Sequence, residues 1–346
     1  MNKDASATLF HPFVTEELAL PDAGAQVLFI GARPGARLPE GFVAPLKCVQ
    51  GFRPDYLGLV REGREVTPVS SASVYDTALV LAARHRAETE LRLASALTNV
   101  KAGGLVVVAG GNEDGVGALR TRLEKRDGHF AVPVAGRLSK HHGVVFWLYR
   151  TPQAEAFAQQ RLDALAARPL VEGRFRTAPS SFSHDGIDAG SRLLAECLPA
   201  DMTGSVADFC AGWGFLSAEL ARRGSPIARV DLYEADHASL EAARDNMARL
   251  APNVSARFLW WDLVGEPVSE RYDAIIMNPP FHQGRASEPG LGEALIGSAA
   301  KALRKGGRLL LVANRQLPYE AALAKGFGRV ERLREEAGFK VFCAVR

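Results

Sequence analysis

The sequence has no long hydrophobic run, no closely spaced cysteine pair and no strong excess of charge of either sign. A membrane-spanning helix needs about 18 or more consecutive apolar residues, and no segment provides them. The first residues, Met1-Asn2-Lys3-Asp4, lack the basic start and the apolar core of a signal peptide. We therefore expect no membrane segment and a cytoplasmic location.

The cysteines also exclude a class of site. Cys48, Cys197, Cys210 and Cys343 are far apart in the sequence, so the Cys-x-x-Cys spacing of many zinc sites is missing. Free thiols in a reducing compartment fit this pattern better than disulfide bonds. We predict that the functional site holds no metal ion.

What remains is the composition of an ordinary globular protein, in which 47% of the 346 residues are apolar and 23% are charged. At about 150 residues per domain, this length suggests two domains. The net charge of +3 indicates no polybasic module. If the partner is a nucleic acid, a local group of basic residues must bind it.

Apolar strands and amphipathic helices alternate in the second half of the chain. We predict strands at Val206–Phe209, Ile227–Tyr233, Ala256–Trp260, Tyr272–Met277 and Arg308–Ala313, and helices at Phe215–Arg222, His237–Leu250 and Leu291–Leu303. This alternation is typical of a parallel sheet covered by helices on both faces. The runs Arg329–Arg334 and Lys340–Val345 flank a short turn and predict a closing antiparallel hairpin.

The first half repeats features of the second half in the same order. Tyr75–Val80 resembles Tyr272–Met277, Lys101–Val108 resembles Arg304–Leu311, and Val145–Arg150 resembles Val341–Arg346. Each similarity is weak alone, but their common order indicates a duplicated α/β domain. We predict that the helical run Glu155–Ala167 packs on the first copy and that Arg168–Arg176 is a linker.

The two copies differ where their strands end. The first strand of the second copy runs into Asp208-Phe209-Cys210-Ala211-Gly212-Trp213-Gly214, and the matching segment of the first copy is Phe29-Ile30-Gly31-Ala32-Arg33-Pro34-Gly35. The second copy also has extra residues after Met277, among them Asn278-Pro279-Pro280-Phe281. We predict domains at 1–168 and 169–346, with the functional site in the second.

The loop after the first strand of the second copy has the features of a cofactor site. Ligands of doubly wound sheets bind beyond the carboxyl ends of the strands. Gly212 and Gly214 allow a ligand to approach the backbone, and Asp208 supplies a hydrogen-bond acceptor. The next strand ends at Glu234, where an acid suits the hydroxyls of a ribose. Asp262, after the third strand, can accept from an adenine amino group.

Two cofactors are compatible with this loop. A dinucleotide needs Gly-x-Gly-x-x-Gly to receive its pyrophosphate, and the third glycine is missing here. S-adenosylmethionine carries no phosphate, and its loop typically reads acid-x-Gly-x-Gly-x-Gly, with Cys210 here in place of the first glycine. The loop favours S-adenosylmethionine but does not exclude a nicotinamide cofactor.

The sequence Asn278-Pro279-Pro280-Phe281 directly follows a predicted strand. Successive prolines form a rigid loop that cannot continue the sheet, so the Pro279 carbonyl and the Asn278 side-chain oxygen can both accept from one planar amino group. Such contacts favour a pyramidal nitrogen whose lone pair faces a methyl donor. Phe281 offers a ring on which a base can stack. The alternative is a structural turn with Phe281 in the core.

Together, Asp208–Gly214, Glu234 and Asn278–Phe281 resemble the class I S-adenosylmethionine-dependent methyltransferases that act on an amino nitrogen. The longer strings Asn278–Gly284 and Phe182–Leu194 are similar to the bacterial 16S ribosomal RNA guanine-N2 methyltransferases of the small subunit and to their large-subunit relatives. The resemblance covers nearly the whole chain and is strongest from residue 180 onward.

This resemblance implies two tandem Rossmann-like methyltransferase domains, each with a seven-stranded, mostly parallel sheet and an antiparallel C-terminal hairpin. The first would be degenerate, without a cofactor site, and would serve as scaffold and RNA-binding surface. In the catalytic domain, S-adenosyl-L-methionine would contact Asp208, Cys210, Gly212, Gly214, Glu234, Asp262 and Asn278. Catalysis would fall to Asn278, Pro279, Pro280 and Phe281, and substrate contact to Phe281 and His282.

The implied reaction is methyl transfer to N2 of a guanine in 16S ribosomal RNA, with the RNA or the small ribosomal subunit as partner and the protein acting as a monomer. Because guanine N2 pairs with cytosine, the base must be unpaired or flipped. Phe182–Ser191 would cover the cofactor, with Asp188 and Ser191 either as ligands or as a turn and a helix cap. Candidate RNA contacts are Arg84, Arg86, Lys101, Arg137, Lys140, Arg174 and Arg176.

Other functions stay open at this point. The same motif serves a guanine in 23S ribosomal RNA, the N6 amine of a tRNA adenine or a protein glutamine. A non-catalytic RNA-binding assembly factor could keep the fold as a relic, although the retained Glu234 and Asn278 argue against it. A nicotinamide oxidoreductase would need a third phosphate-loop glycine and a proton-relay group, and neither is evident.

Overall fold

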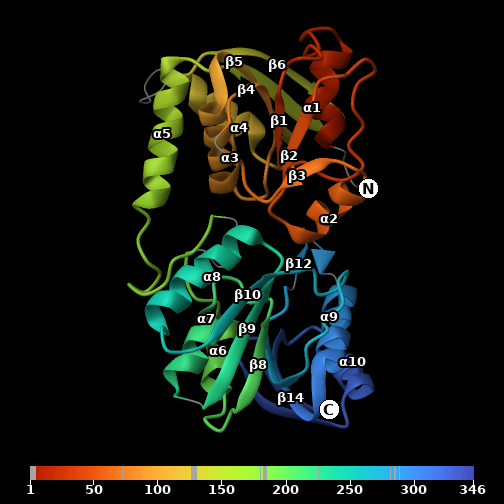
Figure 1. The fold of residues 1–346 in the computed structure, drawn as a ribbon, viewed down its shortest axis with the longest axis vertical. Helices are drawn as coiled ribbons and strands as arrows, with labels where there is room; N and C mark the ends of the chain where they lie inside the picture. Colours follow the sequence, from red (N-terminus) through yellow and green to blue (C-terminus); the bar gives the residue numbers. More distant parts are fainter. Residues whose placement is uncertain are drawn as a thin grey trace. The chain divides into compact units, whose positions relative to one another are not determined.

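In the computed structural model the chain forms two compact units, Met1–Arg168 and Pro169–Arg346, coloured from red to yellow-green and from green to blue in Figure 1. The structure describes residues 5–71, 73–125, 131–179, 181, 185–224, 226–280, 282–283, 286–287 and 289–346, with backbone only between 281 and 290. None of the helices in these ranges has both the length and the apolar character needed to cross a membrane.

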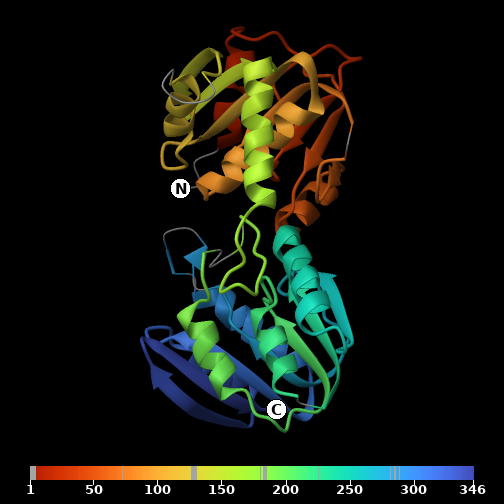
Figure 2. The same cartoon turned by 90° about the vertical axis from the view of Figure 1, so that its left-hand side faces the viewer.

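The first unit has one sheet with the strand order β3-β2-β1-β4-β5-β7-β6. Its elements are α1 (Ala5–Val14), β1 (Val27–Ile30), β2 (Leu46–Val49), α2 (Arg53–Arg61), β3 (Glu65–Thr67), β4 (Tyr75–Leu81), α3 (Arg86–Asn99), β5 (Val100–Gly111), α4 (Val116–Glu124), β6 (Val134–Lys140), β7 (Gly143–Tyr149) and α5 (Pro152–Ala166). The strands β1 to β5 pair in parallel, whereas β7 runs antiparallel to β5 and β6. As predicted, α5 packs on this unit, next to α3 (Figure 2).

The second unit repeats this order as β10-β9-β8-β11-β14-β16-β15. Its elements are α6 (Ala189–Cys197), β8 (Gly204–Phe209), α7 (Phe215–Arg222), β9 (Ile227–Glu234), α8 (His237–Leu250), β10 (Ala256–Trp260), β11 (Tyr272–Met277), β12 (His282–Gln283), β13 (Ala286–Ser287), α9 (Pro289–Ala302), β14 (Leu303–Asn314), α10 (Tyr319–Gly326), β15 (Arg329–Glu336) and β16 (Phe339–Val345). The short strands β12 and β13 form a separate antiparallel pair.

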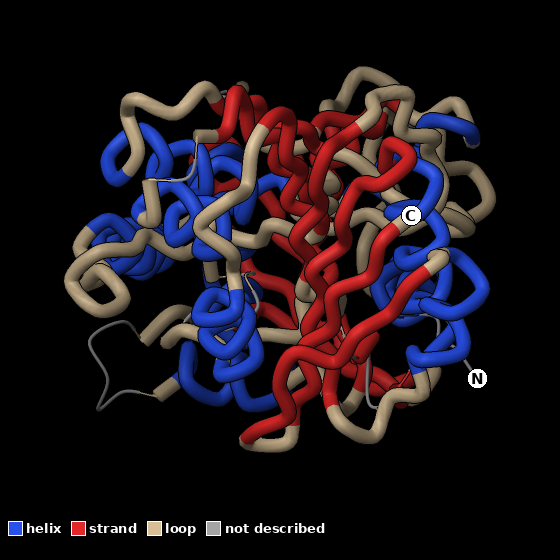
Figure 3. Tube along the Cα trace, turned by 90° about the horizontal axis from the view of Figure 1, so that it is seen from below, coloured by secondary structure: helices blue, strands red, loops and turns tan. Residues whose placement is uncertain are grey.

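Helices cover both faces of the second sheet, as the view from below shows (Figure 3). Successive strand residues point to opposite faces, so Val206 and Ile276 join the core under α6, α7 and α8. Their neighbours Ala207 and Ile275 join the core under α9 and α10. Burial on both faces explains why these strands are almost continuously apolar, as is typical of parallel sheets.

The same backbone features recur in both units. Gly103 in β5 has φ +72° and Gly306 in β14 has φ +79°, a region that glycine adopts without strain. The Gly103 N–H donates to the Arg150 carbonyl at 2.9 Å, and the Gly306 N–H donates to the Arg346 carbonyl at 2.7 Å. The predicted fold class, two tandem α/β domains with a mostly parallel seven-stranded sheet and an antiparallel hairpin in each, is confirmed.

The start of the second unit corrects one prediction. Phe175 is fully buried, and its ring centroid lies 5.0 Å from that of Trp213. The side chain of Asn246 in α8 accepts from the Arg176 N–H and donates to the Arg176 carbonyl, both at 2.8 Å. The prediction of a linker over Arg168–Arg176 is therefore wrong, because an aromatic anchor and these hydrogen bonds hold most of the segment on the second unit.

Candidate functional site

The predicted site residues meet at one edge of the second sheet. The strand β8 lies between β9 and β11, so the chain runs outward through β9 and β10 and then returns to the other side of β8. Ligands of α/β sheets bind at such a reversal of strand order. Asp208, Glu234, Asp262 and Asn278 lie at or just beyond the carboxyl ends of β8, β9, β10 and β11.

Asp208 is a fully buried carboxyl group at the end of β8. Its Oδ2 accepts from the Ser217 hydroxyl in α7 at 2.7 Å, whereas Oδ1 is buried and has no donor among the described residues. Burial raises the pKa of Asp208 to about 7; the hydrogen bonds from Ser217 oppose this shift and the nearby Glu234 adds to it. An unpaired buried acceptor costs free energy, and a ligand N–H or O–H would satisfy it.

The loop after β8 turns through left-handed backbone conformations at Cys210 (φ +61°), Gly212 (φ +54°) and Gly214 (φ +82°). A Cβ at Gly212 would meet no atom within 4 Å, whereas a Cβ at Gly214 would lie 3.1 Å from the Ala243 Cβ of α8. Gly212 therefore leaves open space beside the backbone, and Gly214 lets the loop pack on α8. Burial raises the pKa of the Cys210 thiol well above its usual value, so the thiol stays neutral.

Glu234 is the half-buried last residue of β9. Its Oε2 accepts from the Gly212 N–H at 2.8 Å and its Oε1 accepts from the Asp236 N–H at 2.9 Å. A carboxylate offers about four acceptor positions, so both oxygens can still accept from a ligand. Desolvation raises the pKa of Glu234 to about 7, although the backbone N–H groups oppose this shift.

Asp262 lies in a tight turn after β10. Its Oδ1 accepts from the Val264 N–H at 3.0 Å, and its own N–H donates to Glu266 Oε2 at 2.9 Å. The turn fixes the carboxylate near the predicted edge of the sheet, with Oδ2 packed against Gly265, where a Cβ would lie 2.3 Å from it. An adenine contact through Asp262 remains a prediction that this position allows.

The carboxamide of Asn278 is fixed by two acceptors. Its Nδ2 donates to Asp188 Oδ2 at 3.0 Å and to Ser191 Oγ at 2.6 Å. Because both amide hydrogens are used, only Oδ1 is left to interact with a ligand, and this oxygen is buried with no hydrogen-bond donor in the part of the chain that the structure describes. The ring of Pro279, which comes next, is buried, and Pro280 is exposed.

Part of the predicted motif lies outside the described residues. Nothing is described for Phe281, and the structure gives only the backbone of His282, which pairs with Ser287 between β12 and β13. The predicted segment Phe182–Ser191 is described from Asp185 onward. The roles of Phe281 and His282 therefore stay predictions.

The structure gives roles to Asp188 and Ser191, which the sequence left open as cofactor ligands or as a turn and a helix cap, and it adds Ser217, which the sequence did not connect to the site. Asp188 caps α6, because its Oδ2 accepts from the Ser191 N–H at 2.8 Å. The spacing Asp188-x-x-Ser191 predicts this cap, but no local signal indicates that both side chains also hold Asn278. Ser217 was missed in the same way, since only the fold brings its hydroxyl to Asp208.

The chemistry of the donor set favours one kind of ligand. Asp208, Glu234, Asp262 and Asn278 all offer oxygen acceptors, and the carboxyl groups become negative above their pKa values. Such a site attracts hydroxyl, amino and cationic groups and repels a pyrophosphate. S-adenosylmethionine, with its ribose, adenine amine, ammonium and sulfonium groups, therefore fits these residues, and a dinucleotide does not. Within the described ranges, no group of three His, Cys, Asp or Glu residues could hold a metal ion.

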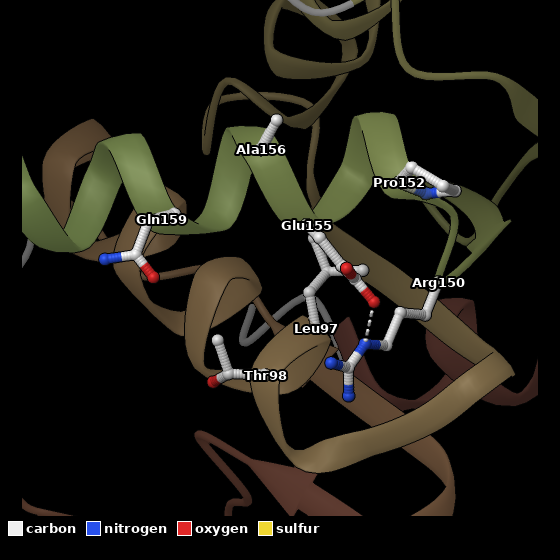
Figure 4. A pocket seen from close by; sticks show the side chains of 7 residues that line it. All are labelled: Leu97, Thr98, Arg150, Pro152, Glu155, Ala156 and Gln159. Carbon is white, nitrogen blue, oxygen red and sulfur yellow. Dashed lines mark hydrogen bonds and ion pairs between the residues drawn. The ribbon is translucent and has the colours of Figure 1, made fainter.

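A hollow in the first unit offers no comparable chemistry. It lies between the end of α3 and the start of α5 and is lined by Leu97, Thr98, Arg150, Pro152, Glu155, Ala156 and Gln159 (Figure 4). The Arg150 guanidinium donates to Glu155 Oε1 at 2.7 Å and to the Val100 carbonyl. Arg150 and Glu155, the only charged residues in this lining, thus neutralise each other and form hydrogen bonds within the unit.

Comparison with known proteins agrees with this geometry. The family model of the methyltransferase small domain matches residues 172–343. Ribosomal RNA small subunit methyltransferase C of Salmonella choleraesuis (strain SC-B67) is 33% identical over 281 residues, which are 81% of this chain and 78% of the relative. The protein of the same name from Klebsiella pneumoniae is 33% identical over 280 residues, or 80% of this chain and 78% of the relative.

A solved structure covers both units. The 16S rRNA N2 methyltransferase RsmC of T. thermophilus, in complex with AdoMet and guanosine, is 25% identical to this chain with a TM-score of 0.73. The match covers 96% of this chain and 91% of that protein. The similarity therefore extends to the duplicated architecture as well as to the second unit.

Proposed function

The chain belongs to the ribosomal RNA small subunit methyltransferase C family, and on this premise we propose that it is an enzyme that methylates N2 of a guanine in 16S ribosomal RNA, with S-adenosyl-L-methionine as methyl donor. The T. thermophilus relative is an N2 methyltransferase of 16S rRNA whose structure holds both AdoMet and guanosine. The acceptor-rich edge of the second sheet in this chain suits both molecules.

One observation carries the proposal: the Asn278 carboxamide is held with Oδ1 free to accept. The lone pair of an exocyclic guanine amine is delocalised into the ring, which makes the amine a poor nucleophile. Oδ1 of Asn278 and the carbonyl of Pro279 would each accept one of its hydrogens, which favours a pyramidal nitrogen with an available lone pair. This contribution is positioning and electrostatic stabilisation and needs no strong base.

The cofactor would be held chiefly by Asp208, Cys210, Gly212, Gly214, Glu234 and Asp262, and Asn278 would border it and contribute little to its affinity. When bound, S-adenosyl-L-methionine supplies a methyl group on a positively charged sulfur. Oδ1 of Asp208 would accept from a cofactor donor, the Glu234 oxygens would accept from the ribose hydroxyls, and the Asp262 carboxylate would accept from the adenine amine. The open space beside Gly212 admits the ligand without a side-chain clash.

The residues after Asn278 would shape the substrate pocket. Pro279 and Pro280 would keep the two acceptors in a fixed corner, because proline restricts the backbone. Phe281 would stack on the target base, as aromatic side chains do with splayed RNA bases, and His282 would contact the substrate without acting as an obligatory base.

We assign the first unit to scaffolding and RNA contact. Two of the candidate basic residues already form ion pairs: Lys101 of the first unit with Asp76 at 2.6 Å, and Arg174 of the second unit with Glu219 at 3.0 Å. Arg84, Arg137 and Lys140 are exposed, and no ion pair joins them to other described residues. We expect their triple replacement by alanine to raise KM for RNA and leave kcat unchanged. The proposal also includes a monomer that works in the cytoplasm.

The decisive experiment is methyl transfer from labelled S-adenosyl-L-methionine to separated ribosomal subunits and to protein-free ribosomal RNA, followed by mapping of the labelled base. We expect label on guanine N2 of 16S RNA, which Asn278→Ala abolishes while cofactor binding persists. Asn112→Ala, at an exposed asparagine of the first unit, is the matched control and should transfer normally. Label on another RNA or on protein would overturn the proposed target.

A further inference from the structure

We propose that Asp188 is a positioning residue that selects which end of the Asn278 carboxamide faces the substrate amine, with Ser191 as a second contact that holds the same nitrogen. This inference rests on the proposed function, because it concerns the same amine site. Neither residue needs to touch substrate or cofactor in this role. They act through Asn278, from a helix that begins far away in the sequence.

The contacts account for every hydrogen of the Asn278 amide. Nδ2 donates one hydrogen bond to Asp188 Oδ2 at 3.0 Å and one to Ser191 Oγ at 2.6 Å. An amide nitrogen has two hydrogens, so no donor remains to meet the substrate. The opposite end, Oδ1, has no donor among the described residues, and a substrate N–H can fill that position.

Selection is necessary because the two ends of a carboxamide have nearly the same size and shape. With the amide rotated by half a turn, Nδ2 would face the substrate, and an amine donor would meet another donor. The same rotation would bring Oδ1 close to Asp188 Oδ2. Since an ionised carboxylate can only accept, two acceptors would then face each other without a proton between them. Asp188 thus excludes the unproductive orientation.

Asp188 is itself fixed by the start of α6. Its Oδ2 also accepts from the Ser191 N–H at 2.8 Å, so one oxygen caps the helix and holds Asn278. A Cβ at Gly190 would lie 3.0 Å from this Oδ2 and 2.8 Å from the Phe339 ring in β16. Gly190 therefore lets the first turn of α6 sit close to the sheet, where Leu194 is fully buried.

A charged partner also changes the strength of the acceptor. Hydrogen bonds to a carboxylate are stronger than those between neutral groups, and linked hydrogen bonds polarise one another. Donation from Nδ2 to Asp188 shifts electron density within the carboxamide toward Oδ1. The oxygen that faces the amine consequently becomes a better acceptor than that of an asparagine bonded only to neutral groups.

Kinetics of substituted proteins test the role. We expect Asp188→Ala to lower kcat on the order of 10- to 100-fold, with KM for RNA and the cofactor Kd changed less than about threefold. Asp188→Asn should recover only part of the loss, because an asparagine oxygen can still accept and cap the helix but the charge that strengthens the Asn278 acceptor is gone. Thr151→Ala removes the cap of α5 in the first unit and should lower the unfolding temperature without lowering kcat. A kcat in Asp188→Ala equal to that of Thr151→Ala would overturn the proposal.

An exchange of the two groups gives a sharper signature. Asn278→Asp places two carboxyl groups in contact and should be nearly inactive. In the double variant Asp188→Asn with Asn278→Asp, the new amide can turn its NH2 group to the new carboxylate, at the cost of the cap bond from the Ser191 N–H, and the second carboxylate oxygen again faces the substrate. We expect the double variant to be about tenfold more active than Asn278→Asp alone, a rescue that a cap alone does not produce. Equal activity of the two variants would contradict the positioning role.

A measurement without turnover separates this inference from the proposed function. The side-chain NH2 signals of Asn278, identified by their loss in Asn278→Asp, should exchange slowly with solvent in the unmodified protein. Asp188→Ala should speed this exchange at least about tenfold, because one of the two hydrogen bonds is lost. Unchanged exchange would overturn the positioning even if methyl transfer were observed. Absence of methyl transfer to RNA with the expected change in exchange would overturn only the function.

Discussion

The two units turn from their central strand into the next segment along the same backbone path. Cys210 (φ +61°) and Gly214 (φ +82°) in the second unit correspond to Gly31 (φ +73°) and Gly35 (φ +79°) in the first, as the pairing of β8 with β11 and of β1 with β4 shows. The turn is thus a property of the shared fold. The difference between the units lies in the side chains that the turn presents.

Two acids of the second unit have neutral counterparts in the first. The register places Phe29 where the second unit has Asp208, and Gln50 where it has Glu234. Gln50 Oε1 accepts from the Phe52 N–H at 2.8 Å, much as Glu234 accepts from the Asp236 N–H. Gln50 Nε2, however, donates to the Ala32 carbonyl at 2.7 Å. The Gln50 amide therefore forms its hydrogen bonds within its own loop, whereas the Glu234 carboxylate keeps acceptor positions for a ligand.

The third difference fills the space beyond the strands of the first unit. Leu81 stands at the position of Asn278, and the Arg92 guanidinium donates to its carbonyl at 2.8 Å and to Glu88 Oε1 at 2.6 Å. A Cβ at Gly31 would overlap Nη1 of Arg92. An internal arginine thus lies where the second unit offers its ligand edge. The comparison teaches that a few side chains at strand ends, and not the sheet, distinguish the proposed ligand site from the matching edge of the first unit.

The largest effect is expected for Asn278→Leu, which gives the second unit the side chain that Leu81 provides at the matching position of the first unit. We expect turnover to fall on the order of 10³-fold, because the substrate loses an acceptor made for its transition state. Cofactor affinity should change only about threefold. Single-turnover methyl transfer and calorimetric titration with S-adenosyl-L-methionine measure the two effects. Turnover within tenfold of the unmodified protein would remove Asn278 from the mechanism.

Glu234→Gln makes the ribose position of the second unit resemble Gln50. In the unmodified protein the Gly212 N–H donates to Glu234 Oε2 at 2.8 Å. The glutamine places an NH2 group at this position, so one acceptor is lost and two donors face each other. We expect the cofactor Kd to rise on the order of 10- to 100-fold, measured by calorimetry. Gln50→Glu in the first unit is the matched control and should leave the Kd unchanged. A similar loss in both variants would point to general destabilisation.

Solution pH should affect the two units differently. The pKa values of Asp208 and Glu234 are raised to about 7, whereas Phe29 and Gln50 do not titrate. The folded protein therefore retains protons that the unfolded chain has released, and the free energy of unfolding should decrease as the pH rises from about 4.5 to 7. Thermal unfolding without ligand checks this sign. No decrease would mean that the carboxyl groups are not desolvated.

Cofactor binding should depend on pH in the opposite sense. The ionised carboxylates are the better acceptors for ribose hydroxyls and cationic groups. We expect the Kd for S-adenosyl-L-methionine to be roughly tenfold lower at pH 8 than at pH 6, since binding favours the deprotonated form. The Glu234→Gln variant should show a flatter profile. An equally steep profile in that variant would assign the dependence to another group.

Local patterns predicted the strands and helices well. The helix Phe215–Arg222 and the strands Ala256–Trp260 and Tyr272–Met277 have the predicted bounds, because a glycine or a polar residue lies within two residues of each end. The strand β14 begins at Leu303, earlier than predicted. The pairing of its first residues with β11 is irregular. Gly306 and its polar neighbours also interrupt the apolar pattern, so the pattern alone does not show that the strand begins before them.

The candidate site was predictable only in part. Each strand end could be read from its own segment, so Asp208, Glu234 and Asn278 follow from sequence and strand order. The hydrogen bonds from Asn278 to Asp188 and Ser191 could not, because they join segments that only the packing of α6 brings together. The burial of Phe175 was missed for the same reason. The nearby prolines and glycine suggested a linker, whereas the contacts of Phe175 with residues distant in the sequence hold the segment on the second unit.

The smallest effect is expected for Arg92→Ala, which empties the guanidinium position in the first unit. The Leu81 carbonyl loses its donor, so the free energy of unfolding should fall by about 1–2 kcal/mol, measured by urea denaturation. Arg86→Ala on the same helix is the control, because its ion pair with Glu90 involves an exposed arginine and should contribute less than about 0.5 kcal/mol. Emptying the space should not create a second cofactor site, since Phe29 and Gln50 still offer no carboxylate. Calorimetry should therefore find one equivalent of S-adenosyl-L-methionine per chain before and after the substitution, and a second equivalent would show that Arg92 alone keeps the first unit closed.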